Sequence, residues 1–369
     1  MRVVIAGGGT AGHVAPGLAL GRELARRGHE VAFVGTDRGL EARLVPAAGF
    51  ELHLLPTVPF VRKVSPAALR APAAALRAVG RCRTVVRGAG AVVGMGGYAS
   101  VPAVLAAWRE RIPRVLHEQN AAPGLANRAL SRLATVVALS FPDAGPRFPR
   151  RVRQTLTGNP VREAILHARR DRAALADAAR TEFDLAVDRR TVVVFGGSQG
   201  ALRVDRAVLG AAPRLGSLGA GLQFVLITGP AHLGSMRAEA PPPRDGPVVR
   251  LLGFVDRMEL AYAVADLVIA RGGASTVAEV SACGVPSILI PYPHAIAGEQ
   301  EANARALERA GGAVVMRDAD VTPETLAARI ASLVWDDDRL GAMADRAAAF
   351  GRPDAASRLA ALVEEVASR

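Results

Sequence analysis

Two stretches of this sequence place a short apolar run directly before a glycine-rich turn and a helical pattern. They are residues 2–13, Arg-Val-Val-Ile-Ala-Gly-Gly-Gly-Thr-Ala-Gly-His, and residues 191–201, Thr-Val-Val-Val-Phe-Gly-Gly-Ser-Gln-Gly-Ala. A helix that begins behind such a turn presents free backbone N–H groups, which suit a phosphate group. Because one such start opens each half of the chain, the sequence predicts two nucleotide-type domains with phosphate-binding loops at their mouths.

Strands and helices alternate along the whole chain. Continuous apolar runs, typical of parallel strands buried on both faces, lie at 3–5, 31–34, 91–93, 114–116, 135–139, 192–195, 223–228, 249–252, 266–270 and 286–290. Breakers at Gly158-Asn159-Pro160 and Gly351-Arg352-Pro353 mark the boundaries. We expect an α/β protein of two doubly wound Rossmann-like domains facing across a cleft, 1–160 and 161–352, with a last helix, about 353–369, packed back on the first.

Composition narrows the class of protein and its compartment. Half of the 369 residues are hydrophobic, enough to bury two α/β cores. The only cysteines, Cys82 and Cys283, lack metal-ligand spacing, which favours a reducing compartment. We expect no secretory signal, because Met1 and Arg2 lead straight into a strand. Residues 88–108 are uncharged, but their glycines and proline predict a strand, a loop and a helix rather than a membrane span.

The net charge of +12 has a local concentration at residues 62–87, where basic and apolar residues are interleaved. Such a stretch fits an anionic membrane surface, nucleic acid or a solvated helix face. Nucleic acid is disfavoured, because aromatic residues make up only 4% of the chain. The charge pattern alone leaves the other two interpretations open.

The first glycine loop also matches a different class of protein. Gly7, Gly9 and Gly12 fit the dinucleotide-binding fingerprint, and Asp37 follows the second strand where a ribose-binding acid would stand. A nicotinamide-dependent dehydrogenase is therefore a competing interpretation. His13 argues against it, because an imidazole in the first helical turn would obstruct a bound pyrophosphate. A further glycine loop at 94–98 favours a pair of long diphosphate-bearing ligands, and a purely structural turn at His13 is the remaining alternative.

The second half holds the better nucleotide site. Residues 271–279, Arg-Gly-Gly-Ala-Ser-Thr-Val-Ala-Glu, follow a predicted strand, and their small side chains let backbone N–H groups approach a diphosphate. Glu279 fits either a ribose diol or a capping box that begins at Thr276. We expect the same place to receive Ser198, Gln199, Arg162 and residues 298–303. Together they resemble the donor site of a two-domain glycosyltransferase.

Seven motifs follow one another along the chain. They are residues 8–13 (GGTAGH), 94–98 (GMGGY), 117–120 (HEQN), 157–162 (TGNPVR), 196–201 (GGSQGA), 254–258 (FVDRM) and 274–279 (ASTVAE). They resemble the MurG family, the peptidoglycan N-acetylglucosaminyltransferases of glycosyltransferase family 28, over nearly the whole chain. The resemblance implies a GT-B fold. It also implies transfer of N-acetylglucosamine from UDP-N-acetylglucosamine (UDP-GlcNAc) to the C4 hydroxyl of the N-acetylmuramoyl unit of lipid I, giving lipid II with inversion.

The resemblance also implies the residues that contact the substrates. Those for UDP-GlcNAc are Thr10, Ala11, Gly12, Asn120, Arg162, Ser198, Val255, Ala274, Ser275, Thr276, Val277, Ala278, Glu279 and Gln300. Gln199 and Asn303 join them from the same stretches, Asn303 for a sugar hydroxyl. On the acceptor side we expect Gly96, Gly97, Tyr98 and His117. Arg162 and Ser198 suit the diphosphate, since charge-assisted and hydroxyl hydrogen bonds hold its oxygens.

Transfer needs a base for the acceptor hydroxyl and stabilisation of the UDP leaving group. His13 is the candidate base, because imidazole titrates near neutral pH, and Glu118 is the alternative. Helix dipoles, backbone N–H groups and Arg162 are expected to offset the diphosphate charge, so we expect no metal and no other cofactor. The run Asp336-Asp337-Asp338 contains an Asp-x-Asp pattern, but it follows a predicted helix, which argues against a metal site.

The sequence departs from the family pattern at four positions. Ala11 and Val101 stand where glycine is usual, Asp205 where asparagine is common and Glu299 where glutamine or histidine is. The first two are expected to change the shape of the acceptor side slightly. Asp205 puts any polar role at that position in doubt.

A lipid acceptor implies a peripheral protein on the cytoplasmic face of the cell membrane. We expect segment 62–87, with Val101, Leu105, Trp108 and Ile112, to face anionic lipid, and we expect no nucleic-acid partner. The alternatives are another lipid-linked sugar transferase of the same superfamily, the dehydrogenase, and a nucleotide-sugar-binding protein without catalysis.

Overall fold

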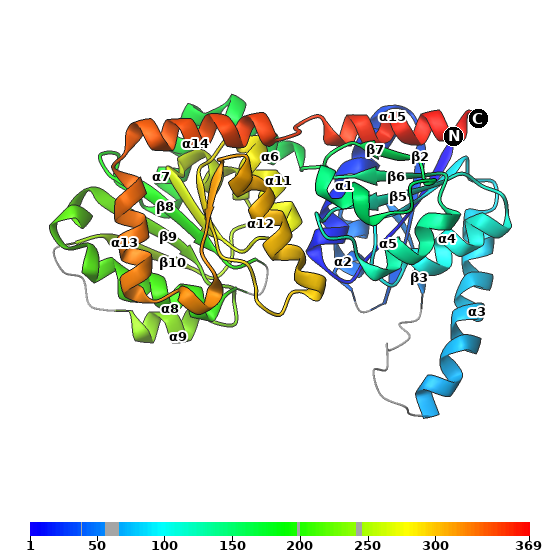
Figure 1. Cartoon of the computed structure of the whole chain (residues 1–369), viewed down its shortest axis with the longest axis horizontal. Helices are drawn as coiled ribbons and strands as arrows, with labels where there is room; N and C mark the ends of the chain where they lie inside the picture. The colour runs from blue at the N-terminus through cyan, green and yellow to red at the C-terminus, as the bar shows by residue number, and fades with distance from the viewer. Residues whose placement is uncertain (38, 56–65, 198–199, 241–245) are drawn as a thin grey trace. The chain divides into compact units, whose positions relative to one another are not determined.

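The computed structural model describes residues 1–37, 39–55, 66–197, 200–240 and 246–369 (Figure 1). The chain divides into two compact units. The first unit is Met1–Arg162 together with Pro353–Arg369, and the second unit is Glu163–Arg352. Each unit is built around its own parallel sheet.

The first unit has a seven-stranded sheet in the order β3-β2-β1-β4-β5-β6-β7, with every neighbouring pair parallel. Its strands are β1 (Arg2–Ala6), β2 (Glu30–Thr36), β3 (Glu51–Leu55), β4 (Ala91–Gly94), β5 (Arg114–Glu118), β6 (Val136–Leu139) and β7 (Gln154–Leu156). Its helices are α1 (Ala11–Arg26), α2 (Glu41–Ala47), α3 (Pro66–Val86), α4 (Ser100–Arg109), α5 (Leu125–Leu130) and α15 (Ala355–Ala367). The strand order reverses direction between β1 and β4, and ligands of open α/β sheets bind outside the strand ends at such a switch point.

The second unit has a six-stranded parallel sheet in the order β10-β9-β8-β11-β12-β13. Its strands are β8 (Arg190–Phe195), β9 (Leu222–Ile227), β10 (Val248–Leu252), β11 (Leu267–Ala270), β12 (Ser287–Leu289) and β13 (Ala313–Val315). Its helices are α6 (Glu163–Arg170), α7 (Arg172–Phe183), α8 (Leu202–Ala211), α9 (Leu233–Glu239), α10 (Met258–Val264), α11 (Ala274–Cys283), α12 (Glu299–Arg309), α13 (Pro323–Val334) and α14 (Asp337–Phe350). The switch point here lies between β8 and β11.

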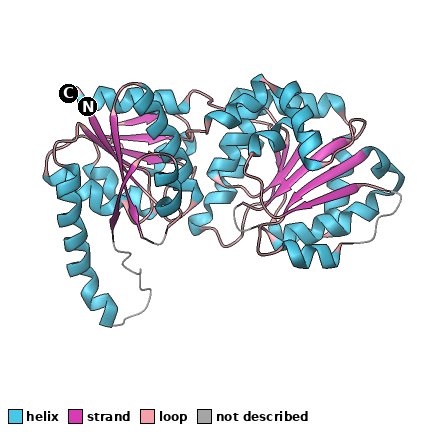
Figure 2. Cartoon of the chain, turned by 180° about the vertical axis from the view of Figure 1, so that it is seen from behind, coloured by secondary structure: helices cyan, strands magenta, loops and turns pink. Residues whose placement is uncertain are grey.

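Helices cover both faces of each sheet (Figure 2). In β1, Val3 and Ile5 pack in one buried cluster with residues of α1 and α15, whereas Val4 and Ala6 pack in a second cluster with residues of α3 and α4. A strand that alternates between two cores must be apolar at every position, which explains the continuous apolar runs. The prediction of two doubly wound Rossmann-like domains is confirmed.

Three edge strands, β3, β7 and β13, were not among the predicted apolar runs. β3 carries Glu51 and His53, and only its last residue, Leu55, is buried. β13 has only 3 residues. A strand at the edge of a sheet is covered less than a central one, so its sequence lacks the continuous apolar signature.

The last helix, α15, belongs to the first unit. Leu359 and Val363 are fully buried in the same cluster as residues of α1 and β1. Around this core, Arg27 Nη1 donates to Glu364 Oε2 at 2.8 Å and Arg153 Nη2 donates to Glu365 Oε2 at 2.7 Å. The chain therefore returns from the second unit to complete the core of the first.

Among the helices of the described residues, none has the length and hydropathy that a bilayer span requires.

Candidate active site

The first glycine loop joins β1 to α1 at the switch point of the first unit. β1 ends at Ala6 and α1 begins at Ala11, so residues 7–10 form the whole connection. Gly9 has a φ of 90°, a conformation that favours glycine. Gly7 donates its N–H to Val34 O at 3.1 Å, which ties the loop to β2. Thr10, Ala11 and Gly12 therefore stand together at the N-terminus of α1, in a position that suits an anion.

His13 lies in the first turn of α1, between the first glycine loop and the loop that follows β4. Its Nδ1 is 3.1 Å from Thr10 Oγ1. A Cβ atom at Gly96 would lie 3.0 Å from His13 Cδ2, and one at Gly97 would lie 2.6 Å from Gly8 O. Glycines at 96 and 97 thus let the two loops approach each other at the histidine. Burial lowers the pKa of His13, and the carbonyl of Gly8 and the charge of Glu41 oppose this shift.

His117, at the end of β5, is fully buried. Its Nε2 lies 3.0 Å from Gly158 O, and its Nδ1 accepts from Gln119 Nε2 at 3.1 Å. The same Gln119 amide donates to Met95 O at 2.6 Å. Burial lowers the pKa of His117 to about 4, so the ring is neutral at pH 7. His117 links β5, the loop after β4 and the turn at residue 158, rather than presenting a ring to solvent.

Glu118 has both carboxylate oxygens engaged. Oε1 accepts from Asn120 N at 2.9 Å, and Oε2 accepts from Gly124 N at 3.1 Å and from Asn127 Nδ2 at 2.9 Å. Burial raises the pKa of Glu118, and these donors oppose that shift. The carboxylate shapes the connection between β5 and α5 and thereby places Asn120.

The turn at residues 157–162 closes the first unit. Arg162 is its last residue and is partly buried, as is Tyr98 after β4. Asn159 is 5% exposed, and its side-chain amide has no hydrogen-bond partner among the described residues. Because buried amides are nearly always paired, Asn159 is a candidate ligand contact. Asn159 belongs to the TGNPVR motif at 157–162 but was not among the predicted site residues.

The second unit has its own pair of loops at the switch point between β8 and β11. After β8, a Cβ atom at Gly200 would lie 1.8 Å from Thr228 O, so only glycine fits there, at a φ of 77°. The predicted donor residues Ser198 and Gln199 lie outside the described residues. The second loop leads from β11 into α11, which begins at Ala274.

Residues 274–279 form the first turns of α11. Gly273 is the N-cap, and Val277 is fully buried, with its backbone N–H donating to Gly273 O at 2.9 Å and its carbonyl accepting from Ser281 Oγ at 2.6 Å. The capping box at Thr276 is wrong, because the helix begins two residues earlier and no side chain caps it. Glu279 Oε2 instead accepts from Tyr262 Oη at 2.7 Å. The predicted contact Val255, after β10, also has a buried side chain, at 8% exposure.

Helix α12 packs its N-terminus against the loop between β11 and α11. A Cβ atom at Gly272 would lie 2.5 Å from Gln300 O. Asn303 is fully buried and donates from Nδ2 to Gly272 O at 3.2 Å, while Gln300 Oε1 accepts from Tyr292 N at 3.0 Å. These bonds bring Gln300, Asn303 and the start of α11 together.

The Asp336-Asp337-Asp338 run begins α14. Asp336 Oδ1 accepts from Arg339 N at 3.0 Å as the helix cap, and Asp337 pairs with Arg190. Acidic residues at this position stabilise a helix N-terminus. Within the described part of the chain, no three His, Cys, Asp or Glu side chains are grouped as metal ligands would be.

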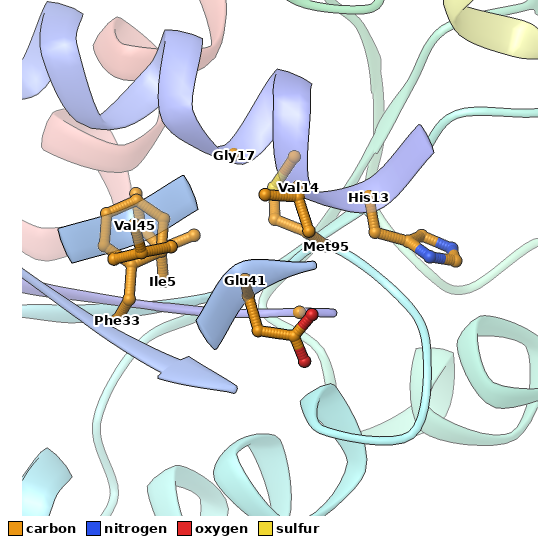
Figure 3. A pocket seen from close by; sticks show the side chains of 9 residues that line it. Ile5, His13, Val14, Gly17, Phe33, Glu41, Val45 and Met95 are labelled. Carbon is orange, nitrogen blue, oxygen red and sulfur yellow. The ribbon is translucent and has the colours of Figure 1, made fainter. Parts of the chain in front are cut away.

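Glu41 is a second residue of the first unit that was not predicted from the sequence. It begins α2, is 1% exposed, and accepts from Gly9 N at 2.9 Å. Figure 3 shows Glu41 and His13 among the residues that line one pocket. No local pattern marks Glu41, since the loop it holds lies 32 residues earlier. Asp37, which fitted a ribose-binding acid, is exposed.

Comparison with known proteins identifies the family of this chain. The family model for the glycosyltransferase family 28 N-terminal domain matches residues 3–139, and the model for the C-terminal domain of that family matches residues 191–359. The chain belongs to glycosyltransferase family 28.

Full-length relatives and a solved structure agree with the family. A protein of Acidothermus cellulolyticus is 45% identical over 373 residues, covering 100% of this chain and 98% of the relative. One of Mycolicibacterium paratuberculosis is 47% identical over 367 residues, covering 97% of this chain and 87% of the relative. Both are named UDP-N-acetylglucosamine–N-acetylmuramyl-(pentapeptide) pyrophosphoryl-undecaprenol N-acetylglucosamine transferase. The crystal structure of Acinetobacter baumannii MurG matches with a TM-score of 0.80 and 29% identity over 99% of both chains, which confirms the GT-B fold class.

Proposed function

We infer that this chain is an inverting hexosyltransferase that moves N-acetylglucosamine from UDP-GlcNAc to the C4 hydroxyl of the N-acetylmuramoyl unit of lipid I, forming lipid II for peptidoglycan. The names of relatives at 45% and 47% identity over almost the whole chain support this reaction. The structural observation that supports this reaction is the position of His13. Its imidazole is partly buried at the switch point of the first unit, between two glycine loops.

We assign the donor to the second unit. The N–H groups at the starts of α8 and α11 suit the diphosphate, because the positive ends of both helix dipoles lie at the switch point. Glu279 accepts hydrogen bonds from the ribose hydroxyls. Its carboxylate is oriented by the Tyr262 hydroxyl, which donates to Oε2 at 2.7 Å. The backbone at Val255 is the contact for uracil, and Gln300 is a contact for the sugar. Ser198 and Gln199 are also proposed as donor contacts. Only their sequence motif supports this, because both lie outside the described residues.

We assign the acceptor to the first unit, with His13 as the base. Because Nδ1 lies beside Thr10 Oγ1 at 3.1 Å, Nε2 is the nitrogen that takes the proton. The C4 oxygen of the muramoyl unit then forms its bond to C1 of N-acetylglucosamine. The C1–O bond to UDP breaks, and UDP leaves with the electron pair. Burial favours the neutral imidazole, which is the form that a base needs.

The remaining residues have supporting roles in this proposal. Glu118 holds Asn120 in place rather than acting as the base, since its oxygens already accept bonds from Asn120, Gly124 and Asn127. Asn303 holds the start of α11 through Gly272 O, rather than reaching a sugar hydroxyl. Arg162, with the helix N-termini, stabilises the departing diphosphate without a metal ion. Gly96, Gly97 and Tyr98 form the acceptor side.

We also propose that the protein binds the cytoplasmic face of the cell membrane from the side of α3. Arg77 and Arg81 are exposed on this helix, Leu76 is 60% exposed, and Trp108 at the end of α4 is 49% exposed. Such a mixture of cations and apolar groups suits anionic headgroups. Ile112 has no part in it, because it is buried in the core.

The test of the reaction is UDP release from UDP-GlcNAc by the purified protein, with and without a soluble lipid I analogue, together with the mass of the product. We expect release that depends on the acceptor and a disaccharide product. Donor binding without acceptor-dependent release would contradict the transferase and favour a binding protein. Failure to bind UDP-GlcNAc would contradict the assignment of the donor to the second unit.

A further inference from the structure

Glu41 is a buried carboxylate with a complete set of donors. Oε1 accepts from Thr36 N at 2.8 Å and from Thr36 Oγ1 at 2.7 Å, and Oε2 accepts from Gly9 N at 2.9 Å. Burial alone would raise the pKa of Glu41, but these hydrogen bonds outweigh it and hold the pKa below its usual value. Glu41 is therefore charged at pH 7, inside the first unit.

Three glycines make room for this carboxylate. A Cβ atom at Gly8 would lie 2.0 Å from Glu41 Oε1, one at Gly35 would lie 2.4 Å from Glu41 Cγ, and one at Gly39 would lie 2.0 Å from Glu41 Oε2. These glycines come from the first loop, from β2 and from the segment before α2. Three separate segments thus enclose Glu41. A larger residue at any of the three glycines would collide with the Glu41 side chain.

The carboxylate acts on His13 in two ways. Mechanically, it holds Gly9, the residue before Thr10, and the Thr10 hydroxyl lies 3.1 Å from His13 Nδ1. Electrostatically, its charge raises the pKa of His13 against the effect of burial. The ring also interacts with His117 of β5, whose pKa is lowered mainly by burial and further by the charge of His13. Figure 3 shows the Glu41 and His13 side chains along one pocket, from α2 and α1.

A purely structural role does not explain this choice of residue. A carboxylate loses its hydration when it is buried, and well-packed apolar residues often fill such a space with equal or better stability. The bonds of Glu41 instead converge on the glycine loop that bears the proposed base.

We propose that Glu41 is a positioning residue, which holds the first glycine loop and the ring of His13 in the arrangement that transfer requires. This inference rests on the proposed function for its effect on turnover. Its effect on His13 itself does not depend on catalysis.

The decisive variant is Glu41→Gln, which keeps the shape and removes the charge. An amide also offers only one acceptor oxygen, so bonds to Thr36 and Gly9 cannot both persist. We expect the His13 ring, followed by NMR of the full chain labelled at histidine, to titrate at lower pH than in the wild type. We also expect turnover with the soluble lipid I analogue to fall ~10²-fold with an unchanged KM for UDP-GlcNAc, because the base is misplaced.

The matched control is Asp266→Asn in the second unit. Asp266 Oδ2 accepts from Thr191 N at 2.7 Å, the same kind of carboxylate-to-backbone bond. We expect it to leave the titration of His13 unchanged. A folded Glu41→Gln protein with wild-type titration of His13 would overturn the proposal.

A second variant, Glu41→Asp, decides the matter if Glu41→Gln does not fold. Aspartate keeps the charge but is too short to bond both Thr36 and Gly9, so turnover should fall while His13 titrates as in the wild type. Wild-type turnover in this variant would overturn the positioning role. If the wild type itself lacks transferase activity while Glu41→Gln shifts the titration of His13, the proposed function fails and the coupling of Glu41 to His13 stands.

Discussion

At the scale of single residues, the proposed base gives the sharpest prediction. Replacing His13 with alanine should lower acceptor-dependent turnover by ~10²–10⁴ and leave the affinity for UDP-GlcNAc largely intact, because only proton transfer is lost. Turnover is measured by UDP release and affinity by calorimetry. His167→Ala, on partly exposed α6, is the control and should change neither quantity. Full activity in His13→Ala would remove His13 from the reaction.

The pH dependence of catalysis follows from the same residue. Burial lowers the pKa of His13, so the acidic limb of the kcat/KM profile should lie below the usual pKa of histidine, ~6.5. The rate should rise with pH through this limb, because the neutral ring is the active form. A limb above the usual pKa of histidine would contradict a base in this environment.

Asp205 makes a separate prediction about stability. It is fully buried in the first turns of α8, and neither carboxylate oxygen has a hydrogen-bond partner among the described residues. Burial raises the pKa of Asp205 to about 7, although the charge of Arg271 and the Ala201 backbone oppose this shift. The folded protein therefore keeps a proton that the unfolded chain releases near pH 4, and stability from this group falls as pH rises from about 4 to 7.

Asp205→Asn, the residue common at this position in the MurG family, should relieve that penalty. Relative to the wild type, its free energy of unfolding should increase between pH 4.5 and pH 8 by roughly 2–4 kcal/mol, measured by denaturant titration. Asp266→Asn is the opposite case, because it removes an acceptor that Thr191 N uses, and it should lower stability at pH 8. A constant difference between Asp205→Asn and the wild type across this range would show that Asp205 does not titrate there.

The residue scale is also where sequence reasoning reached its limit. Local motifs placed His13, Gly96 and Gly97 in adjacent loops, since parallel strands bring their ends to one edge of the sheet. These motifs did not predict the hydrogen-bond partners of the buried polar side chains. Glu118 and Asn303 bond to backbone groups that only the folded chain brings close, and Glu41 reaches a glycine far away in sequence.

At the scale of elements, α3 carries the prediction about membranes. Its inner face is buried through Val79, Cys82 and Val86, while Arg77 and Arg81 are exposed. Arg83 differs, because its Nε donates to Glu110 at 2.5 Å. The charges available to lipid on the described part of this helix are therefore those at 77 and 81 rather than 83. One face of α3 packs on its own unit and the other is open, which fits a solvated helix face, and binding of the open face to a membrane stays a prediction.

Reversing Arg77 and Arg81 to glutamate should weaken binding to anionic vesicles at least ~10-fold, because each cation near such a surface contributes ~1 kcal/mol. Binding is measured by sedimentation with vesicles that contain phosphatidylglycerol, and affinity for UDP-GlcNAc should not change. The same reversal at exposed Arg169 and Arg170 of α6 is the control for net charge. Equal losses in both proteins would mean that overall charge, and not α3, governs the interaction.

The elements themselves were largely predictable. Central strands need apolar side chains on both faces, so their runs are visible without a structure. A hydroxyl residue before proline is a further sequence signal of a helix start: α13 begins at Pro323 behind Thr322, whose hydroxyl accepts from Thr325 N at 3.2 Å. The capping box at Thr276, one of the two interpretations of this pattern, is absent, because the pattern lies inside α11, whose N-cap is Gly273. Short sequence patterns cannot distinguish a helix start from the turn that follows it.

At the scale of the whole molecule, each unit has its own hydrophobic core, and the stability of each core can be tested separately. Leu359 of α15 is fully buried in the core of the first unit, and Leu326 of α13 is fully buried in that of the second. Replacing either leucine by alanine removes buried contacts and leaves a cavity, which should cost ~2–5 kcal/mol. The damage should stay within the unit that contains the leucine, although Leu359 follows the entire second unit in sequence.

Calorimetry of the full chain with added UDP distinguishes the two units, because a ligand raises the unfolding temperature of the part that binds it. We expect UDP to raise one transition, assigned to the second unit. Leu326→Ala should lower that transition, whereas Leu359→Ala should lower the other transition and leave the effect of UDP intact. If each variant instead lowered a single shared transition by the same amount, the two units would unfold together, and the assignment of UDP to one of them would need direct evidence from binding.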